Sequence, residues 1–341
     1  MKKLIVYFFS FIFICFILPA ILTKQDIVAS SSIEKRENIS NNTISEKENK
    51  QVYEYKNYKT IKLLHKENGE IEEIELDKYL INVVSAEMPV SYHIEALKAQ
   101  AVVARTYTIY KIQNKKHYNA DICDDSACCQ AWISKEDRFA RWEESERENN
   151  WKKIEQCVYD TAGEIITYDS KPINAFFHAN SGGKTELPVN VWGGGTGLPY
   201  LQVVETLGEE GYTQYSSEVI LKKDELIEKV KTKHVDIIIN FDNEEEIKII
   251  EYTESGRVKT VKIGNYEFSG VEIRTLLGLR STNFEITREE DRIKFIVKGY
   301  GHGVGMSQTG ADTKAKQGNN YKDIIKHFYV GVEIKLENEL L

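Results

Sequence analysis

The chain has 341 residues, of which 41% are hydrophobic and 29% are charged, and its net charge is −8. This length and apolar content suffice for one large globular domain or two smaller ones. The acidic balance argues against a nucleic-acid-binding protein, because such proteins usually carry a basic surface.

Residues 1–23 predict a membrane anchor. Lys2 and Lys3 precede the uncharged run LIVYFFSFIFICFILPAILT at 4–23, which is long enough to cross a bilayer as a helix. The two lysines favour a cytoplasmic N-terminus and an exported remainder. No convincing small-residue cleavage site follows directly, so a retained signal anchor is favoured over a cleaved signal peptide. Residues 24–51 are polar and charged, which predicts a disordered linker.

The segment from residue 52 to Glu87 predicts two strands and a helix. The strand-like stretches VYEYKNY and TIKLLHK are followed by an Asn-Gly pair at 68–69, which is a hairpin signal. LDKYLINVV at 76–84 has apolar residues at helical spacing. Glu87 then stands directly before a Met-Pro pair, and proline disfavours helix at the residue before it. We therefore expect the chain to turn just after this carboxylate.

The next run, EALKAQAVVARTY at 95–107, predicts a buried helix because it is small or aliphatic nearly all round. Lys98 and Arg105 are seven residues apart, about two helical turns, so they lie on one face. Buried cations need an anionic or polar partner. That partner could be Glu87, a substrate or both; the alternative is a core helix with one internal ion pair.

Three of the five cysteines lie near a histidine in HYNADICDDSACCQAW. His117, Cys123, Cys128 and Cys129 match the donor set of a tetrahedral zinc site. The alternatives are a disulfide between Cys123 and one of the other two, or small core residues. Metal is favoured because the histidine has no part in either alternative. Four protein ligands would close the site, so it would be structural and would fix the loop that bears Gln130.

Two glycine-containing loops carry further candidate binding residues. After a predicted strand-turn-strand at 163–180, Ser181 and Lys184 flank two glycines, which allow a ligand to approach closely. Both could hydrogen-bond a sugar, or they could be exposed in a tight turn. Trp192 could stack on a sugar ring or pack in the core. His302 follows the strand FIVKGY with glycine on either side, which predicts tightly folded backbone around its imidazole.

Between these loops, residues 212–271 predict an inserted subdomain without evident chemistry. SSEVILKKDELIEKVKTK at 216–233 is expected to be helical and VDIIINFD at 235–242 to be a strand. A turn at 264–265 is expected to close a hairpin.

Five blocks follow one another along the chain: AEMP with EALKAQAVVARTY, the segment ending CCQAW, AFFHANSGGKTE with VWGG, RTLLGLRSTNF, and GYGHGVGMSQTG. Together they resemble the signature of the sporulation stage II protein D family, from about residue 52 to the C-terminus. Two departures are Trp132, where tyrosine is common, and Lys184, where many relatives have arginine. Neither removes a functional group that the implied chemistry needs.

The resemblance implies an α+β domain at 52–341, with mixed helices and antiparallel strands around one catalytic groove. The implied activity is that of a lytic transglycosylase, which cleaves the β-1,4 bond between MurNAc and GlcNAc and leaves a 1,6-anhydro-MurNAc end. Glu87 would be the single catalytic carboxyl, because no water has to be activated. The pKa of Glu87 should be raised. The residues expected to bind substrate are Lys98, Arg105, Gln130, Ser181, Lys184 and His302.

Lys98 and Arg105 would lower the pKa of Glu87 if they faced it, so we expect them to face the substrate or other groups. The resemblance further implies a single-pass protein of the mother-cell engulfing membrane, with its catalytic domain on the extracytoplasmic side. Its partners would be glycan strands freed of stem peptides, the amidase/endopeptidase stage II protein P and the membrane protein stage II protein M. Two alternatives are a non-catalytic amidase enhancer that binds peptidoglycan, and a zinc hydrolase, which a closed four-ligand site disfavours.

Overall fold

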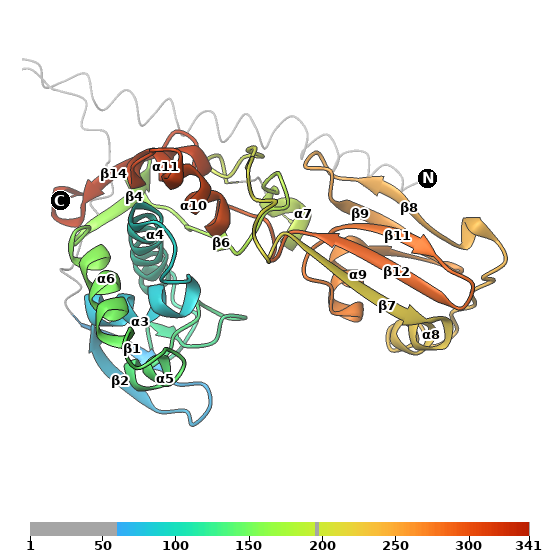
Figure 1. Ribbon diagram of the computed structural model, residues 1–341, viewed down its shortest axis with the longest axis horizontal. Helices are drawn as coiled ribbons and strands as arrows, with labels where there is room; N and C mark the ends of the chain where they lie inside the picture. Colours follow the sequence, from blue (N-terminus) through green and yellow to red (C-terminus); the bar gives the residue numbers. More distant parts are fainter. Residues whose placement is uncertain (1–59, 195–197, 341) are drawn as a thin grey trace, which may run out of the picture. The chain divides into compact units, whose positions relative to one another are not determined.

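The computed structural model describes residues 60–194 and 198–340, and Figure 1 labels their helices and strands. The expected transmembrane segment at 4–23 and the linker at 24–51 lie outside the described residues. Within those residues, no helix combines the length and the apolar character needed to cross a bilayer.

A first hydrophobic core is built from helices and short strands. β1 and β2 pair antiparallel, with Leu64 opposite Ile71, which confirms the predicted hairpin. The elements around this core are β1 (Thr60–Leu64), β2 (Ile71–Glu75), α3 (Leu76–Glu87), α4 (Ile94–Gln113), β3 (Ile122–Cys123), α5 (Lys135–Ala140), α6 (Arg147–Tyr159), β4 (Glu164–Tyr168), β5 (Lys171–Pro172), β6 (Phe177–His178), α7 (Pro188–Trp192), β13 (Met306–Ser307), α10 (Gln308–Lys316), α11 (Tyr321–Phe328), β14 (Glu333–Leu336) and the 3-10 helix η3 (Glu337–Leu340).

Helix α4 is the centre of this first core, as its apolar sequence predicted. It packs against α3, α6, α10, α11 and β4 (Figure 1). Every residue from Ala96 to Ile109 is buried except Lys98. Each fully buried Val or Leu of the helix contributes about 1.5–3 kcal/mol to folding. The small alanines between them let the neighbouring helices approach closely.

A second hydrophobic core draws its buried residues from Leu221 through Val297. They come from two antiparallel three-stranded sheets, β10-β9-β8 and β11-β12-β7, and from two helices. The elements are β7 (Ser216–Lys222), α8 (Lys223–Lys231), η2 (Glu244–Glu246), β8 (Ile247–Tyr252), β9 (Val258–Ile263), β10 (Tyr266–Ser269), α9 (Gly270–Leu277), β11 (Asn283–Arg288) and β12 (Arg292–Lys298). This core therefore extends past residue 271, where the inserted subdomain was expected to end.

Two local expectations in this region were wrong. Residues 216–222 form strand β7 instead of the first turns of a helix, because the whole segment pairs antiparallel with β12 and Leu221 is buried. Residues 235–242 contain no strand. Val235 and Ile238 are largely exposed, and the backbone N–H of Ile238 donates to the Asn265 side chain. The apolar run thus lacks the partner strand that β structure requires.

Buried polar contacts join the second core to the loop that begins at Ser181. Arg257, directly before β9, is 1% exposed, and its Nη2 donates to the Ser181 carbonyl at 2.6 Å. The buried carboxylate of Glu186 accepts hydrogen bonds from Thr253 at 2.6 Å and Ser255 at 2.8 Å. Because buried charges without partners are costly, these contacts fix the loop against β8 and β9.

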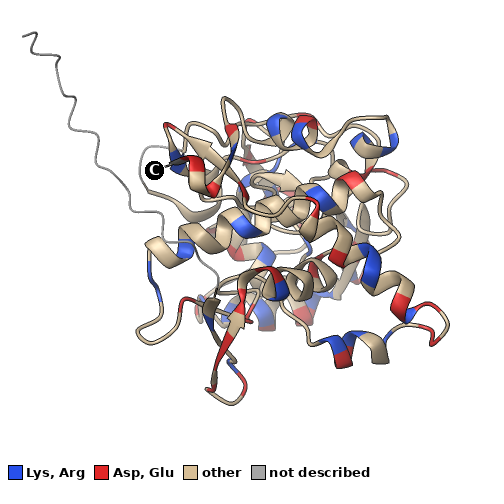
Figure 2. Cartoon of the chain, turned by 90° about the vertical axis from the view of Figure 1, so that its left-hand side faces the viewer, with Lys and Arg blue, Asp and Glu red and all other residues tan. Residues whose placement is uncertain are grey.

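The expected mixture of helices and antiparallel strands is confirmed, with short parallel pairings of β1 with β3 and of β6 with β13. Figure 2 shows Lys and Arg interspersed with Asp and Glu along the chain in that view. Many of these charges form exposed ion pairs, such as that between Lys78 and Glu75 at 3.2 Å. Exposed pairs of this kind contribute about 0–1 kcal/mol each.

Candidate active site

Glu87 is the last residue of α3, as its position before a Met-Pro pair predicted. Met88 leaves the helix with extended dihedral angles (φ −123°, ψ 141°), while its N–H still bonds the Val84 carbonyl. Pro89 favours this conformation sterically. Met88 is itself buried, at 1% exposure. The end of α3 is therefore anchored in the core, and Glu87 lies at its edge.

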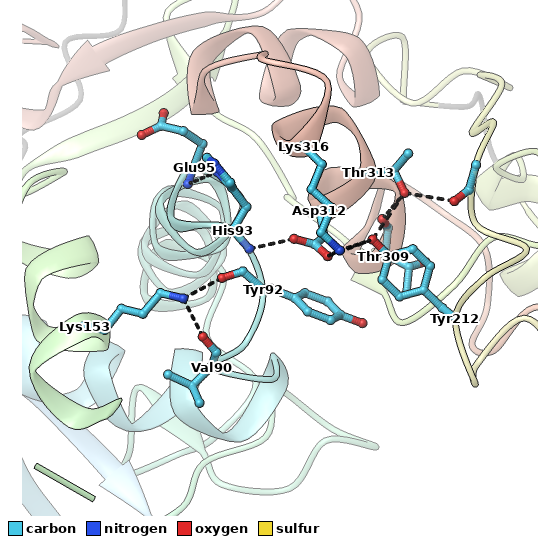
Figure 3. Close-up of polar contacts among 11 residues, drawn as sticks. Val90, Tyr92, His93, Glu95, Lys153, Tyr212, Thr309, Asp312, Thr313 and Lys316 are labelled. Carbon is cyan, nitrogen blue, oxygen red and sulfur yellow. Dashed lines mark hydrogen bonds and ion pairs between the residues drawn. The ribbon is translucent and has the colours of Figure 1, made fainter. Parts of the chain in front are cut away.

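The turn from α3 into α4 is held by two charged side chains from other elements (Figure 3). Asp312 of α10 accepts a hydrogen bond from the His93 N–H at 2.6 Å. Lys153 of α6 donates to the carbonyls of Val90 and Tyr92, both at 2.7 Å. These contacts cap the backbone between the carboxylate and the central helix, so they limit how far Glu87 can move.

The Glu87 carboxylate accepts two hydrogen bonds and forms no ion pair with any of the described residues. Oε1 accepts from the Ala131 N–H at 2.7 Å, and Oε2 accepts from the Gln308 amide at 3.4 Å. Burial raises the pKa of Glu87, and the two hydrogen bonds partly offset that rise. This direction agrees with the prediction, and it favours the protonated carboxyl at higher pH than is usual for glutamate.

Glu87 lines a cavity of about 700 Å³, which is within the range of small-ligand sites. Among the described residues that line this cavity, Glu87 is the only acid. Other lining residues are Tyr107, Lys111, Lys116, Cys128, Cys129, Gln130, Phe176, His178, Trp192, Val271, Arg274, Tyr300 and His302. The cavity therefore combines one carboxyl with several aromatic rings and several cations.

One wall of the cavity is aromatic. The rings of Phe176 and Trp192 are 4.5 Å apart, and those of Trp192 and His302 are 5.1 Å apart. Gly301 and Gly303 have φ values of 113° and 84°, a region that favours glycine, so the tight backbone predicted around His302 is present. Burial lowers the pKa of His302 well below its usual value. The wall is thus uncharged and offers ring faces on which a sugar can stack.

The predicted histidine-cysteine cluster converges in space. The ligand atoms of His117, Cys123, Cys128 and Cys129 all lie within 4.8 Å of one another. His117 Nε2 is 3.5 Å from Cys129 Sγ and 3.6 Å from Cys128 Sγ, and these two sulfurs are 3.9 Å apart. Tetrahedral zinc would hold nitrogen and sulfur about 3.6 Å apart and two sulfurs about 3.8 Å apart. The described cysteines are all free thiols, so the donor set fits a metal and not a disulfide.

The loop that carries Cys128 and Cys129 also contacts the Glu87 carboxylate. Cys128 and Cys129 precede Gln130 and Ala131, and the Ala131 N–H is the donor to Glu87. The Gln130 side chain is buried and donates to the Tyr79 hydroxyl at 3.0 Å and to Thr108 at 2.9 Å. Gln130 thus lines the cavity but fixes the loop against α3 and α4.

The placement of Lys98 and Arg105 corrects their expected role in substrate binding. Neither lines the cavity. Lys98 pairs with Asp160 at 2.9 Å. Arg105 is 1% exposed and donates to the Thr161 carbonyl at 2.7 Å and to Asp77 at 3.0 Å. Both therefore belong to ion pairs of the first core, and they do not face Glu87.

Ser181 and Lys184 also lie away from the lining of this cavity. Ser181 is fully buried and its hydroxyl contacts Thr206 and the carboxylate of Glu209. Lys184 is exposed and forms an ion pair with Glu205 at 3.8 Å. Of the residues expected to bind substrate, only Gln130 and His302 line the cavity. The loop that begins at Ser181 instead joins the two cores.

Several lining residues were missed from the sequence. Lys111 lies one turn beyond the segment of α4 at 95–107, and Lys116 follows that helix. Arg274 lies in the block RTLLGLRSTNF, which indicated only a helix and a turn. No spacing rule relates these cations to Glu87, because they come from separate elements and meet only in the folded chain.

Comparison with known proteins defines the family. A family model described as Stage II sporulation protein matches residues 64–168, and a model described as Domain of unknown function (DUF8618) matches residues 195–305. The chain is 35% identical to Stage II sporulation protein D of Bacillus amyloliquefaciens over 278 residues, covering 80% of this chain and 78% of that protein. It is also 35% identical to Stage II sporulation protein D of Bacillus subtilis (strain 168), over 78% of this chain and 76% of the relative. The chain is 26% identical to the Amidase enhancer of Bacillus subtilis (strain 168), over 75% of this chain and 40% of that protein. The chain belongs to the stage II sporulation protein D family.

Proposed function

We propose that this protein is a peptidoglycan lytic transglycosylase with Glu87 as its catalytic acid and base. The observation that carries the proposal is a lone carboxyl of raised pKa in a cavity where no other acid is found among the described lining residues. Glycoside hydrolases need a second carboxylate to act on water or on the sugar. A transglycosylase does not, because its nucleophile is a hydroxyl of the substrate itself.

The reaction assigns Glu87 two consecutive steps. The protonated carboxyl donates its proton to the glycosidic oxygen as the bond from C1 of MurNAc to that oxygen breaks, so the leaving GlcNAc gains a hydroxyl. The carboxylate then accepts the proton of the C6 hydroxyl as that oxygen bonds to C1. The product is a 1,6-anhydro-MurNAc end, and Glu87 is again protonated. A raised pKa suits both steps, because the group must be an acid first and a base afterwards.

The surrounding residues position this carboxyl. The Ala131 N–H holds one oxygen at 2.7 Å, which leaves the other oxygen, contacted by Gln308 at 3.4 Å, better able to carry the transferred proton. The aromatic wall of Phe176, Trp192 and His302 would stack on the glycan.

His117, Cys123, Cys128 and Cys129 would hold a zinc ion in a closed four-ligand site. Such an ion has no open coordination position, so it supplies structure and no Lewis-acid step. Its part would be to fix the loop whose Ala131 N–H contacts Glu87. A zinc hydrolase is accordingly disfavoured.

The proposed cellular setting is the membrane of a sporulating cell. The uncharged segment at 4–23 would anchor the protein in the engulfing membrane of the mother cell during sporulation, with the folded domain (52–341) on the extracytoplasmic side. Its substrate would be glycan strands freed of stem peptides, and its partners the amidase/endopeptidase stage II protein P and the membrane protein stage II protein M.

A second candidate function is that of a non-catalytic amidase enhancer. It is favoured by the 26% identity to the Amidase enhancer of Bacillus subtilis. In that case the same cavity would bind glycan, and Glu87 would be a binding residue.

Product analysis distinguishes these functions. The full-length protein, Glu87→Gln and the control Glu73→Gln are incubated with peptide-free glycan strands, and the soluble products are weighed by mass spectrometry. Glu73 is an exposed acid of β2 in an ion pair with Lys62 at 3.8 Å, so its loss should leave activity unchanged. We expect anhydro-MurNAc ends from all but Glu87→Gln. Reducing ends that carry added water would instead mean a hydrolase, and retained binding without cleavage by any of the proteins would mean an enhancer.

A further inference from the structure

The cavity carries more cations than its single carboxyl can match. Lys111, Lys116 and Arg274 line it, and Glu87 is the only acid among the described lining residues. This excess is local, because the whole chain has a net charge of −8 and the two signs are interspersed in the view of Figure 2. A cavity of this charge attracts an anionic ligand.

Of these three cations, Arg274 is the one whose charge is least balanced by neighbouring groups of the protein. It is half-buried, and its guanidinium makes no ion pair or hydrogen bond with any residue in the part of the chain that the structure describes. Lys111, by contrast, lies over the Tyr107 ring at 5.0 Å, and Lys116 is exposed to water. Because Arg274 lines the cavity and no described residue accepts from its guanidinium, the group is free to bind an anionic ligand that enters the cavity.

The fold holds Arg274 firmly at this position. Helix α9 begins with a capping box, in which the Ser269 hydroxyl accepts from the Glu272 N–H at 3.2 Å and the Glu272 carboxylate accepts from the Ser269 N–H at 2.8 Å. Ile273 and Leu277, at 0% and 4% exposure, anchor the helix in the second core. Arg274 is on the helix face next to these anchors, so it enters the cavity from a rigid element.

We infer that Arg274 binds the lactyl carboxylate of an N-acetylmuramic acid residue from which the stem peptide has been removed. The inference rests on the proposed function. In an intact strand this carboxyl is consumed in the amide bond to the stem peptide, whereas in a bare strand it is free and charged. The lactyl group is attached at C3 of the same sugar whose C1 reacts, so its acceptor belongs in the same cavity as Glu87.

The chemistry of arginine fits this role better than that of lysine. A planar guanidinium forms two parallel hydrogen bonds with one carboxylate, which adds direction to the charge attraction. The histidines beside it do not compete for the anion, since burial lowers the pKa of His178 to about 3 and that of His302 well below its usual value. Arg274 is thus a specificity-determining residue, and the second core takes part in substrate selection.

The test compares two glycan strands that differ only at the lactyl group. One has free carboxylates and the other has them converted to methyl esters. Binding of fluorescently labelled strands is measured by anisotropy with the full-length protein in detergent, in a Glu87→Gln background that prevents turnover. We expect this protein to bind the free-acid strand about tenfold more tightly than the ester, since a hydrogen-bonded charge pair is worth that much or more. Arg274→Gln should bind both strands equally, and Arg274→Lys should keep part of the preference.

Arg292→Gln is the matched control. Arg292 is an exposed residue of β12, a strand that also contributes to the second core, and it pairs with Asp291 at 3.6 Å. Its variant should keep the full preference. Equal binding of acid and ester strands by the Arg274-containing protein would overturn the inference, as would an unchanged preference in a folded Arg274→Gln. The proposed function fails separately, if the protein with Glu87 intact binds strands but releases no anhydro-MurNAc ends.

Discussion

The contact between Asp312 and the turn after Glu87 makes a quantitative prediction. The Asp312 side chain is fully buried. It accepts hydrogen bonds from the His93 N–H at 2.6 Å and the Tyr212 hydroxyl at 2.7 Å, and it pairs with Lys316 at 2.7 Å (Figure 3). Asp312→Ala removes all three and leaves the His93 N–H without its acceptor. Each hydrogen bond to a charged group is worth about 1.5–3 kcal/mol, whereas the mostly exposed Lys316 adds under about 1 kcal/mol.

The expected loss for Asp312→Ala is therefore about 3–5 kcal/mol in the free energy of unfolding, measured by urea denaturation. Tyr212→Phe should lose about 1.5–3 kcal/mol and Lys316→Met less than about 1 kcal/mol. The three variants form a series in which only the first frees the backbone of the turn. We also expect the rate of strand cleavage to fall at least about tenfold in Asp312→Ala, because a small displacement of a catalytic group is costly. Strand affinity should change little.

Two results would refute this reasoning. If Lys316→Met is as destabilising as Asp312→Ala, the surface ion pair and not the buried clamp is the main interaction. If Asp312→Ala is destabilised as expected but cleaves strands at the normal rate, the clamp does not position Glu87.

Three further predictions concern the pH response, the metal and the core. Because burial raises the pKa of Glu87, strand cleavage should decline as pH rises through that raised value. The folded state also binds this proton more tightly than the unfolded state, so the protein should lose stability as pH rises from the ordinary glutamate pKa to the raised one. Glu87→Gln should flatten this pH dependence of stability in denaturation curves. An unchanged pH dependence in the variant would contradict the prediction. Metal analysis should find one zinc per chain, and either a chelator or Cys123→Ser should lower the denaturation midpoint. A metal-free protein that is folded and fully stable would exclude a structural role for the zinc. Arg105→Met should cost about 3–5 kcal/mol of stability without weakening strand binding in the folded fraction, and weaker binding at unchanged stability would restore Arg105 to the substrate site.

Much of the local structure could be predicted from neighbouring residues alone. The Asn-Gly turn, the end of α3 before Pro89 and the burial of α4 all follow from propensities and spacing within a few residues. Both failures depend on pairing with strands that are distant in the sequence, which neighbouring residues do not reveal. Residues 216–222 have a sequence compatible with helix, but the edge of β12 made them a strand, and the apolar run at 235–242 found no strand to pair with.

The residues of the candidate site also differ in whether the sequence alone could identify their roles. The donors His117, Cys123, Cys128 and Cys129 could be selected from the sequence, because a metal site requires particular residue types in a short segment. Glu87 was selected as the catalytic carboxyl through the family resemblance. Lys98 and Arg105 could not be assigned correctly, since a cation on a buried helix face satisfies either a core carboxylate or a ligand equally well in sequence terms. The ion pairs that they form in the folded chain, with Asp160 and Asp77, decided the matter.

The sequence by itself determined where helices end, which segment is apolar enough to be central and which residue types are available for acid catalysis and metal binding. Only the tertiary structure decided which of them meet. Asp312 reaches His93 across 219 residues of chain, and Gln308 reaches Glu87 across 221. Arg274 joins the cavity from a different hydrophobic core. Contacts over such separations depend on how distant segments of the chain pack, and that packing sums many weak apolar contacts that no local pattern encodes.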